Sequence, residues 1–237
     1  FSFNYGGTSL SYNSTQNSLF MVGHDWYQMS AEISIPYIVN STNINTLNSA
    51  ALIQNFFDGT EGKLNQINPT DSNSKKIGGQ LIYNNKLYLT GYSYYDGAAT
   101  QSKSHFSSPI KLSTTGQVVG PVQVGNQYPG FVSGYMAQIP PEWQSALGGP
   151  ALTGNCCLSI ISTQSSGPAV SVFDPAKIGT VNPVPATPIL GYPYDHPLSD
   201  WGSTGPYFNG TTRITGVVLP TGTRSLLFIG KHGVGTF

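Results

Sequence analysis

The feature that most constrains this chain is a repeated pattern of glycine, strand, polar turn, strand and glycine. It occurs at residues 5–24, 77–92 and 214–230, and it closes at Gly23, Gly91 and Gly230. These glycines lie 68 and 139 residues apart, which indicates a repeat of about 69 residues. A further copy should then end near residue 160, where the apolar run Cys156–Ser162 predicts its second strand without a closing glycine.

Each pattern is followed by another run in which apolar and polar residues alternate, as expected for half-buried strands. These runs are Ala31–Pro36, Phe106–Leu112 and Ala169–Asp174. Three or four antiparallel strands recurring at a fixed period are typical of propeller blades. We therefore predict an all-β fold, a β-propeller-like array of antiparallel sheet blades. A β-sandwich is the main alternative, but it does not explain the repeated glycine frame.

Two segments are predicted as short helices in loops, at residues 46–57 and 139–147. The second begins with Pro140-Pro141 and ends at Gly148-Gly149, which are favoured helix-start and helix-stop residues. The prediction is a single domain, 1–237, with repeats at about 1–75, 76–130, 131–175 and 211–237 and a long loop insertion at 176–210. This is about 3.4 repeats, fewer than the roughly four to eight blades of closed propellers. We expect flanking sequence or a neighbouring subunit, through self-assembly, to complete the ring.

Composition excludes several classes of protein. Only 8% of residues are charged and the formal net charge is zero, whereas soluble domains average about 25% charged residues. A neutral chain without a basic stripe does not favour nucleic-acid binding, and no apolar run is long enough for a transmembrane segment. Low charge, abundant Asn, Ser, Thr and Tyr, and three glycosylation sequons at Asn13, Asn40 and Asn209 favour an extracellular or cell-surface location.

The two cysteines, Cys156 and Cys157, are adjacent. They form either a vicinal disulfide or a pair of buried thiols in a strand, and the sequence leaves both readings open. No CxxC spacing accompanies them, so we predict no metal site and no cofactor.

Several segments resemble a known group of repeat proteins. They are Tyr5-Gly6-Gly7-Thr8, Val22-Gly23-His24-Asp25, Ala31–Pro36, Ile139–Trp143 and Gly148–Cys157. They look like uncharacterised secreted bacterial β-propeller repeat proteins, and the double glycines loosely resemble kelch-type propellers. The resemblance implies a propeller-like fold and export; it implies no activity.

Most candidate site residues follow the closing glycines, because equivalent positions of a rotational repeat surround one face; Asp195, His196 and Trp201 of the loop insertion are expected to join them. The catalytic candidates are His24, Asp25, Asp96 and His232. The ligand-binding candidates are Trp26, Tyr27, Tyr92, Tyr95, Asp195, His196 and Trp201. Each of these residues has an alternative structural role, since Asp and His at strand ends cap backbone and aromatic residues pack between blades.

Three functions stay open at this point. A ring of carboxylates, imidazoles and aromatic rings favours an extracellular binding or surface-structural module with a glycan ligand. The same groups could serve a secreted carbohydrate-active hydrolase or lyase, in which two carboxyl groups lie about 5–9 Å apart. The unfinished blades also suggest a subunit of an extracellular filament or shell. Gathering of the four catalytic candidates in one pocket would favour the enzyme.

Overall fold

The computed structural model describes all residues except 8, 158–162, 200–207 and 234–237. The described chain is all-β, with one α-helix and three short 3-10 helices. Three sheets have four antiparallel strands, paired in chain order, and a fourth sheet is a two-stranded hairpin.

The four sheets follow one another along the chain. Sheet 1 holds β1 (Leu10–Asn13), β2 (Ser18–Val22), β3 (Ser30–Ser34) and β4 (Leu52–Phe57). Sheet 2 holds β5 (Lys75–Tyr83), β6 (Lys86–Ser93), β7 (His105–Pro109) and β8 (Val119–Val122). Sheet 3 holds β9 (Met136–Gln138), β10 (Ala151–Thr153), β11 (Val170–Phe173) and β12 (Ala186–Leu190). Sheet 4 holds β13 (Arg213–Val218) and β14 (Leu227–Lys231).

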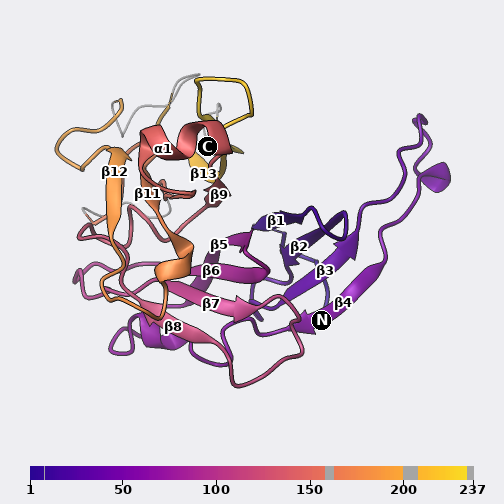
Figure 1. Cartoon of the computed structure of the whole chain (residues 1–237), viewed down its shortest axis with the longest axis horizontal. Helices are drawn as coiled ribbons and strands as arrows, with labels where there is room; N and C mark the ends of the chain where they lie inside the picture. The colour runs from indigo at the N-terminus through magenta and orange to yellow at the C-terminus, as the bar shows by residue number, and fades with distance from the viewer. Residues whose placement is uncertain (8, 158–162, 200–207, 234–237) are drawn as a thin grey trace.

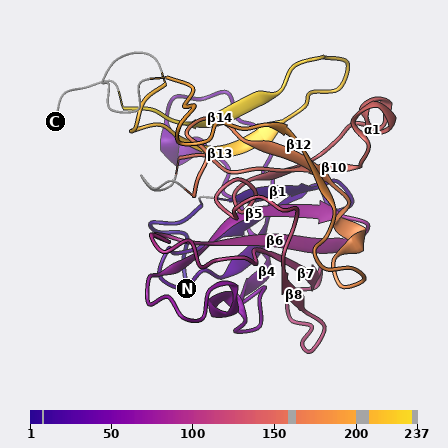
Figure 2. The ribbon, with the colours of Figure 1, turned by 90° about the vertical axis from the view of Figure 1, so that its left-hand side faces the viewer.

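The first strands of the sheets are neighbours in space. β5 lies beside β1 and β9, and β13 lies beside β9 and β5. Figure 1 shows these first strands near the middle of the molecule, with β4, β8 and β12 toward the outside. Figure 2 shows β13 and β14 lying above the strands of sheet 2. Side chains join the first strands directly, since Ser11 Oγ accepts from Ile82 N at 3.0 Å and Gln138 Nε2 donates to Ile82 O at 2.7 Å.

Consecutive sheets pack face to face, each pair through its own hydrophobic cluster. Successive residues of β6 show why: Leu87 and Leu89 face the cluster shared with sheet 1, whereas Tyr88 faces the cluster shared with sheet 3. Neighbouring side chains of a strand point to opposite faces, so sheet 2 buries both. A third cluster, which includes Leu152 and Val217, joins sheets 3 and 4.

The third repeat is complete, and its position differs from the expected one. Its second strand is β10, rather than Cys156–Ser162, and Gly154 follows it as Gly23 follows β2. Residues 158–162 lie outside the described residues. A Cβ atom at Gly154 would come within 2.0 Å of Ala169 O, so the close approach to the next strand requires glycine. The third repeat therefore has its closing glycine. The spacing of the repeats varies because the connections between strands vary in length.

One predicted helix is confirmed and the other is wrong. α1 (Pro141–Leu147) begins after Pro140 and ends at Gly148, which is left-handed at φ 81°. Residues 46–57 form no helix, because 52–57 pair with β3 as β4. The apolar residues of this stretch suit an edge strand as well as a helix, and the free edge of β3 decides between them. β12 falls inside 176–210, the predicted insertion, together with the 3-10 helix η3 (Pro175–Lys177).

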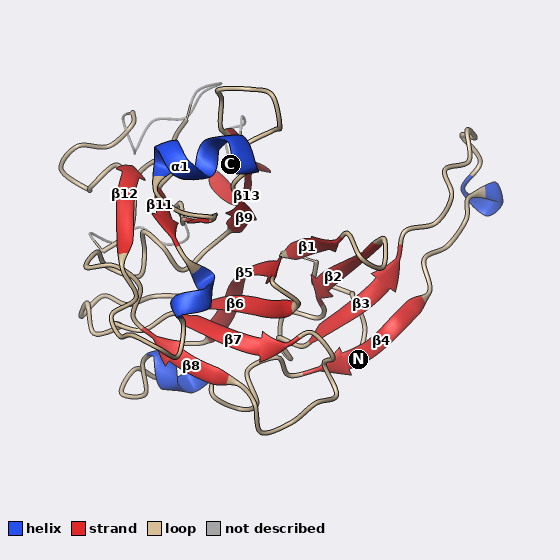
Figure 3. Cartoon of the chain, viewed as in Figure 1, coloured by secondary structure: helices blue, strands red, loops and turns tan. Residues whose placement is uncertain are grey.

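Two further short helices lie in connections. η2 (Leu64–Ile67) follows β4, and its Ile67 packs into the cluster between sheets 1 and 2. η1 (Ile44–Thr46) lies at the tip of a long connection between β3 and β4. We call residues 35–51 the arm; Figure 3 shows it projecting away from the sheets, with η1 at its far end.

A buried histidine joins sheets 2 and 3. His105 in β7 is fully buried, with its Nδ1 2.8 Å from Ser104 Oγ and its Nε2 2.9 Å from Thr153 Oγ1. Its ring meets Phe173 edge-on, with centroids 5.4 Å apart. Burial lowers the pKa of His105 to about 3, so the imidazole is neutral in the folded protein at pH 7.

The close approach at Gly154 predicts a large loss of stability in Gly154→Ala. We expect the free energy of unfolding in urea to fall by about 1–3 kcal/mol, because the added methyl group would overlap a backbone carbonyl. Gly216→Ala is the matched control, since a Cβ there would meet only Ile229 at 3.7 Å. Equal losses in the two variants would contradict the role given to Gly154.

His105 predicts a pH-dependent stability. Its pKa is lower in the folded than in the unfolded chain, where it has its ordinary value of 6.5. Acid therefore favours unfolding, and stability should fall as the pH drops from about 6.5 toward 3. Urea titrations of the wild type and His105→Asn at pH 7 and pH 5 should show a smaller decrease in the variant. The exposed His196→Asn should behave as wild type; equal pH slopes in the wild type and His105→Asn would contradict this prediction.

Candidate functional site

Two of the predicted site residues, Asp25 and Tyr92, lie close together. Asp25 follows β2 and pairs with Lys76 of β5, with Nζ 2.5 Å from Oδ2. Tyr92 at the end of β6 accepts a hydrogen bond from Arg213 Nη2 at 3.1 Å. Burial raises the pKa of Tyr92, the Arg213 guanidinium opposes that rise, and the Asp25 carboxylate adds to it. Residues from sheets 1, 2 and 4 therefore meet here.

Asp25 and Lys76 at this point are already paired with each other, and Arg213 is bonded to the Tyr92 hydroxyl. The side chain of Gln28 also engages Asp25, through Nε2, while its Oε1 accepts from Ile77 N at 2.6 Å. The hollows beside this cluster hold about 10 and 30 Å3, which is room for about one or two water molecules. The cluster joins sheets 1, 2 and 4, and it has no room for a sugar ring.

The other catalytic candidates have separate local partners. His24 Nδ1 accepts from Trp26 N at 3.1 Å, and its ring lies between those of Tyr5 and Tyr27. His232 Nδ1 lies 2.7 Å from Thr212 Oγ1. Each imidazole is thus held by its own turn or strand end.

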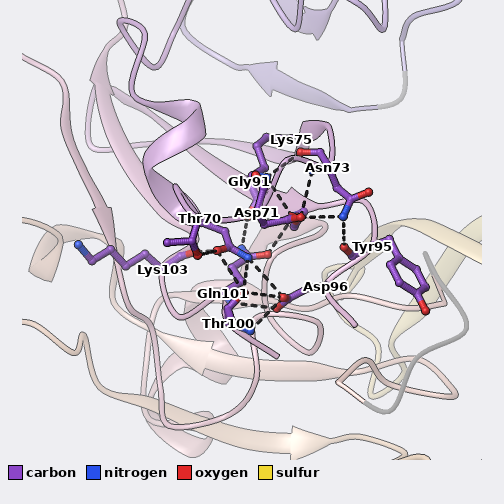
Figure 4. A network of polar contacts seen from close by, with 12 residues as sticks. Thr70, Asp71, Asn73, Lys75, Gly91, Tyr95, Asp96, Thr100, Gln101 and Lys103 are labelled. Carbon is purple, nitrogen blue, oxygen red and sulfur yellow. Dashed lines mark hydrogen bonds and ion pairs between the residues drawn. The ribbon is translucent and has the colours of Figure 1, made fainter. Parts of the chain in front are cut away.

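Asp96 is held in a buried polar network (Figure 4). Its two carboxylate oxygens accept from Thr100 N and Gln101 N, both at 2.9 Å, and Asn68 Nδ2 donates to it at 3.3 Å. The Gln101 side chain in turn donates to the carbonyl of Gly91 at 3.0 Å. Asp96 therefore fixes the connection between β6 and β7, which is the structural role that the sequence left open for it.

A second carboxylate of the same network was not singled out from the sequence. Asp71 accepts from Ser93 Oγ, from Lys75 Nζ at 3.0 Å and from both nitrogens of Asn73. Burial alone would raise its pKa, but the hydrogen bonds from Ser93, Asn73 and Lys75 hold the pKa well below its usual range. Asn73 also donates to the carbonyl of Tyr95 at 2.9 Å, so the network fixes the backbone beside a predicted ligand-binding residue.

The remaining predicted ligand-binding residues are scattered. Trp26 is largely exposed, while Tyr27 and Tyr95 are about half exposed. Asp195 and His196 pair with each other at 3.3 Å, and both side chains are exposed. Trp201 lies outside the described residues. Within the described ranges, no three His, Cys, Asp or Glu side chains gather as a metal would require.

An open groove of about 870 Å3 lies between the connections that leave sheets 2 and 3. Its lining comes from the β6–β7 connection, the β8–β9 connection and β12. It is Ala99, Gln101, Ser102, Gln123, Asn126, Gln127, Tyr128, Pro129, Phe131, Pro188, Ile189, Leu190, Gly191 and Pro193. None of these residues is charged, and we call this hollow the amide groove.

The amide groove combines an aromatic face with neutral hydrogen-bonding groups. Tyr128 is 52% exposed beside the amides of Asn126 and Gln127. Ser171 Oγ donates to Gln127 Oε1 at 3.0 Å, which orients this amide from sheet 3. The buried Gln101 and Phe131 support the floor of the groove. Sequence reasoning missed this site; its signal was the run Gly125-Asn126-Gln127-Tyr128-Pro129-Gly130, an aromatic residue between amides and turn residues.

The adjacent cysteines form a vicinal disulfide, one of the two alternatives left by the sequence. Both are buried in the cluster between sheets 3 and 4. The backbone of Cys157 is left-handed, at φ 68°, and Asn155 Oδ1 accepts from Cys156 N at 2.9 Å. The disulfide thus lies directly after the closing Gly154 and packs inside the fold.

Comparisons with protein-family models, curated proteins and solved structures found no match to this chain. In the described part of the chain, no helix has both the length and the apolar character needed to cross a membrane.

The hydrogen bonds of Asp96 predict that its removal affects stability. Asp96→Ala leaves the N–H groups of Thr100 and of the buried Gln101 without their acceptor, so the free energy of unfolding should fall by about 1–3 kcal/mol. Asp195→Ala, at an exposed carboxylate, is the control and should change it little. Urea denaturation measures both. An unchanged stability in Asp96→Ala would return Asp96 to the group of functional candidates.

Proposed function

We propose that this chain is an extracellular, propeller-type binding module whose amide groove takes a neutral glycan. The groove carries the proposal. Its volume of about 870 Å3 falls in the range of about 300–1,000 Å3 found for small-molecule sites. An exposed tyrosine ring offers a flat apolar surface for a sugar ring, and amides offer both donors and acceptors to hydroxyl groups. The absence of charge from the lining favours a neutral ligand over an acidic one.

The propeller is supported by the way the sheets repeat. Each four-stranded sheet is an antiparallel meander, the first strands β1, β5, β9 and β13 are neighbours, and each sheet packs on the next. Blades arranged around a common axis have these three features. The amide groove then lies at the junction of two successive blades, sheets 2 and 3.

Binding is favoured over catalysis by the positions of the four catalytic candidates. Asp25 is paired with Lys76, Asp96 caps a backbone turn, and His24 and His232 each have their own local partner. A hydrolase needs two such groups facing one reacting bond. The described residues offer no shared pocket for them.

An extracellular location is supported by the disulfide rather than by the sequons. Disulfides persist mainly in oxidising compartments, and Cys156 and Cys157 are paired. Two of the three sequon asparagines are buried: Asn13 donates to Glu32 Oε1 at 3.0 Å, and Asn209 accepts from Thr211 N at 2.8 Å. Asn40, in the arm, is exposed.

Tyr128→Ala should weaken glycan binding by about tenfold or more, since a tyrosine at the centre of a site commonly contributes over about 1.4 kcal/mol. Affinity electrophoresis in gels that contain neutral polysaccharides, after a glycan array has identified the ligand, measures this loss. Trp26→Ala is the matched control, as an exposed aromatic at the face predicted from the sequence, and it should bind as wild type. Loss in Trp26→Ala with normal binding in Tyr128→Ala would place the site at that face instead.

A further inference from the structure

The side chain of Gln127 in the amide groove has one polar atom bonded to the protein and one left free. Its Oε1 accepts from Ser171 Oγ of β11 at 3.0 Å, and Ser171 does not line the groove. Its Nε2 makes no hydrogen bond to any residue that the structure describes, and Gln127 is only partly buried. An amide nitrogen carries two N–H donors, so the groove offers these donors to a ligand.

The buried hydroxyl of Ser171 determines which way this amide points. Ser171 is 1% exposed, and among the described residues Gln127 is the one hydrogen-bond partner of its hydroxyl. With the amide reversed, Nε2 would donate to Ser171 Oγ, and the hydroxyl proton would lose its acceptor. Because a buried donor without an acceptor is unfavourable, the amide keeps Oε1 on Ser171 and leaves Nε2 free.

The other glutamine amides of the groove already donate to the protein. Gln101 Nε2 donates to Gly91 O at 3.0 Å, and its Oε1 accepts from Ser93 N at 2.8 Å. Gln123 Nε2 donates to the carbonyl of the nearby Gly125 at 3.1 Å. Among the glutamines that line the groove, Gln127 thus combines a fixed orientation with a free nitrogen.

An apolar ring lies near the Gln127 amide. Pro188 of β12 is the cross-strand partner of Ser171, and directly opposed residues of antiparallel strands lie close together on one face of the sheet. Pro188 and Gln127 both line the amide groove. Ser171 therefore relates the two: it bonds the Gln127 amide and lies opposite the Pro188 ring.

An oriented N–H donor near an apolar ring matches an acetamido group. The carbonyl oxygen of this group accepts hydrogen bonds, and its methyl group is apolar. A sugar hydroxyl in the same place could also accept from the amide, but it has no methyl group to pack on the ring. The acetamido group is neutral, in keeping with the uncharged lining of the groove.

We propose that the ligand of the amide groove is a sugar that carries an N-acetyl group, an N-acetylhexosamine. Gln127 Nε2 donates to the acetamido carbonyl, and the methyl group packs on Pro188. Tyr128 contacts the sugar ring as in the proposed function, on which this inference rests. Ser171 is a positioning residue, because it acts on the ligand through the Gln127 amide.

Matched sugars that differ in one substituent test this specificity. Methyl glycosides of N-acetylglucosamine and glucose, of N-acetylgalactosamine and galactose, and of N-acetylmannosamine and mannose compete for binding to a neutral-glycan array. At least one N-acetyl sugar should inhibit about tenfold or more strongly than its partner. Array binding without this preference in any pair would overturn the inference and leave the proposed function standing. Absence of binding to every neutral glycan would overturn both.

Variants of the groove amides test the donor. Gln127→Glu keeps an oxygen for Ser171 and replaces the N–H donors with a second oxygen. It should weaken binding of the preferred N-acetyl sugar by about tenfold or more and change binding of the matching hexose little. Asn126→Asp is the matched control, because it adds the same charge at the neighbouring groove residue, and it should keep the preference. An unchanged preference in Gln127→Glu, or an equal loss in Asn126→Asp, would overturn the assignment of the donor.

The ratio of the two affinities separates positioning from general damage to the fold. Ser171→Ala removes the hydroxyl that orients the amide, so the ratio of N-acetyl sugar to hexose affinity should fall by about threefold or more. Ser171→Thr keeps a hydroxyl and should restore the ratio. Tyr128→Ala should instead weaken both sugars alike. A ratio unchanged in Ser171→Ala would overturn the positioning role.

Discussion

The structure depends on burying both faces of its two middle sheets, sheets 2 and 3. Sheet 2 shares one cluster with sheet 1 and another with sheet 3, so alternate residues of β6 serve two different cores. Apolar residues on both faces leave few positions for charges within these sheets. Those charges that approach the interior are paired, as with Lys75 and Asp71, or accept several neutral hydrogen bonds, as Glu32 does from Asn13, Ser18 and Gln54.

Close stacking also determines where open space remains on the molecule. A Cβ atom at Gly78 of β5 would lie 2.0 Å from Ser133 O, just before β9, so these neighbouring first strands leave no room for a side chain there. The sequence placed the candidate site at the end of the sheets that follows the closing glycines. That end is occupied by the Asp25–Lys76 ion pair and by Arg213 bonded to Tyr92, and the hollows beside them are small. Space opens instead between the longer connections, at the amide groove, and along the first strands β1, β5, β9 and β13.

The buried polar network of Figure 4 supports one side of the amide groove. Asp71 and Asp96 hold the connections on either side of β5 and β6, and Gln101 extends from this network to the floor of the amide groove. Neutral amides and hydroxyls serve here as the main partners of the two carboxylates. A protein with abundant Asn, Gln, Ser and Thr can thus fix long connections without adding charge.

The sequence by itself determined the all-β class, the strands of three repeats and α1, because alternation and turn residues are local signals. It also limited Cys156 and Cys157 to two alternatives. Tertiary structure decided what depends on distant neighbours. Residues 52–57 became a strand because β3 offered them an edge, Asp96 joined a buried polar network because Asn68 of the β4–β5 connection lies beside it, and Tyr128 came to line a groove because β12 lies opposite. Such contacts join residues far apart along the chain, and no local pattern encodes them.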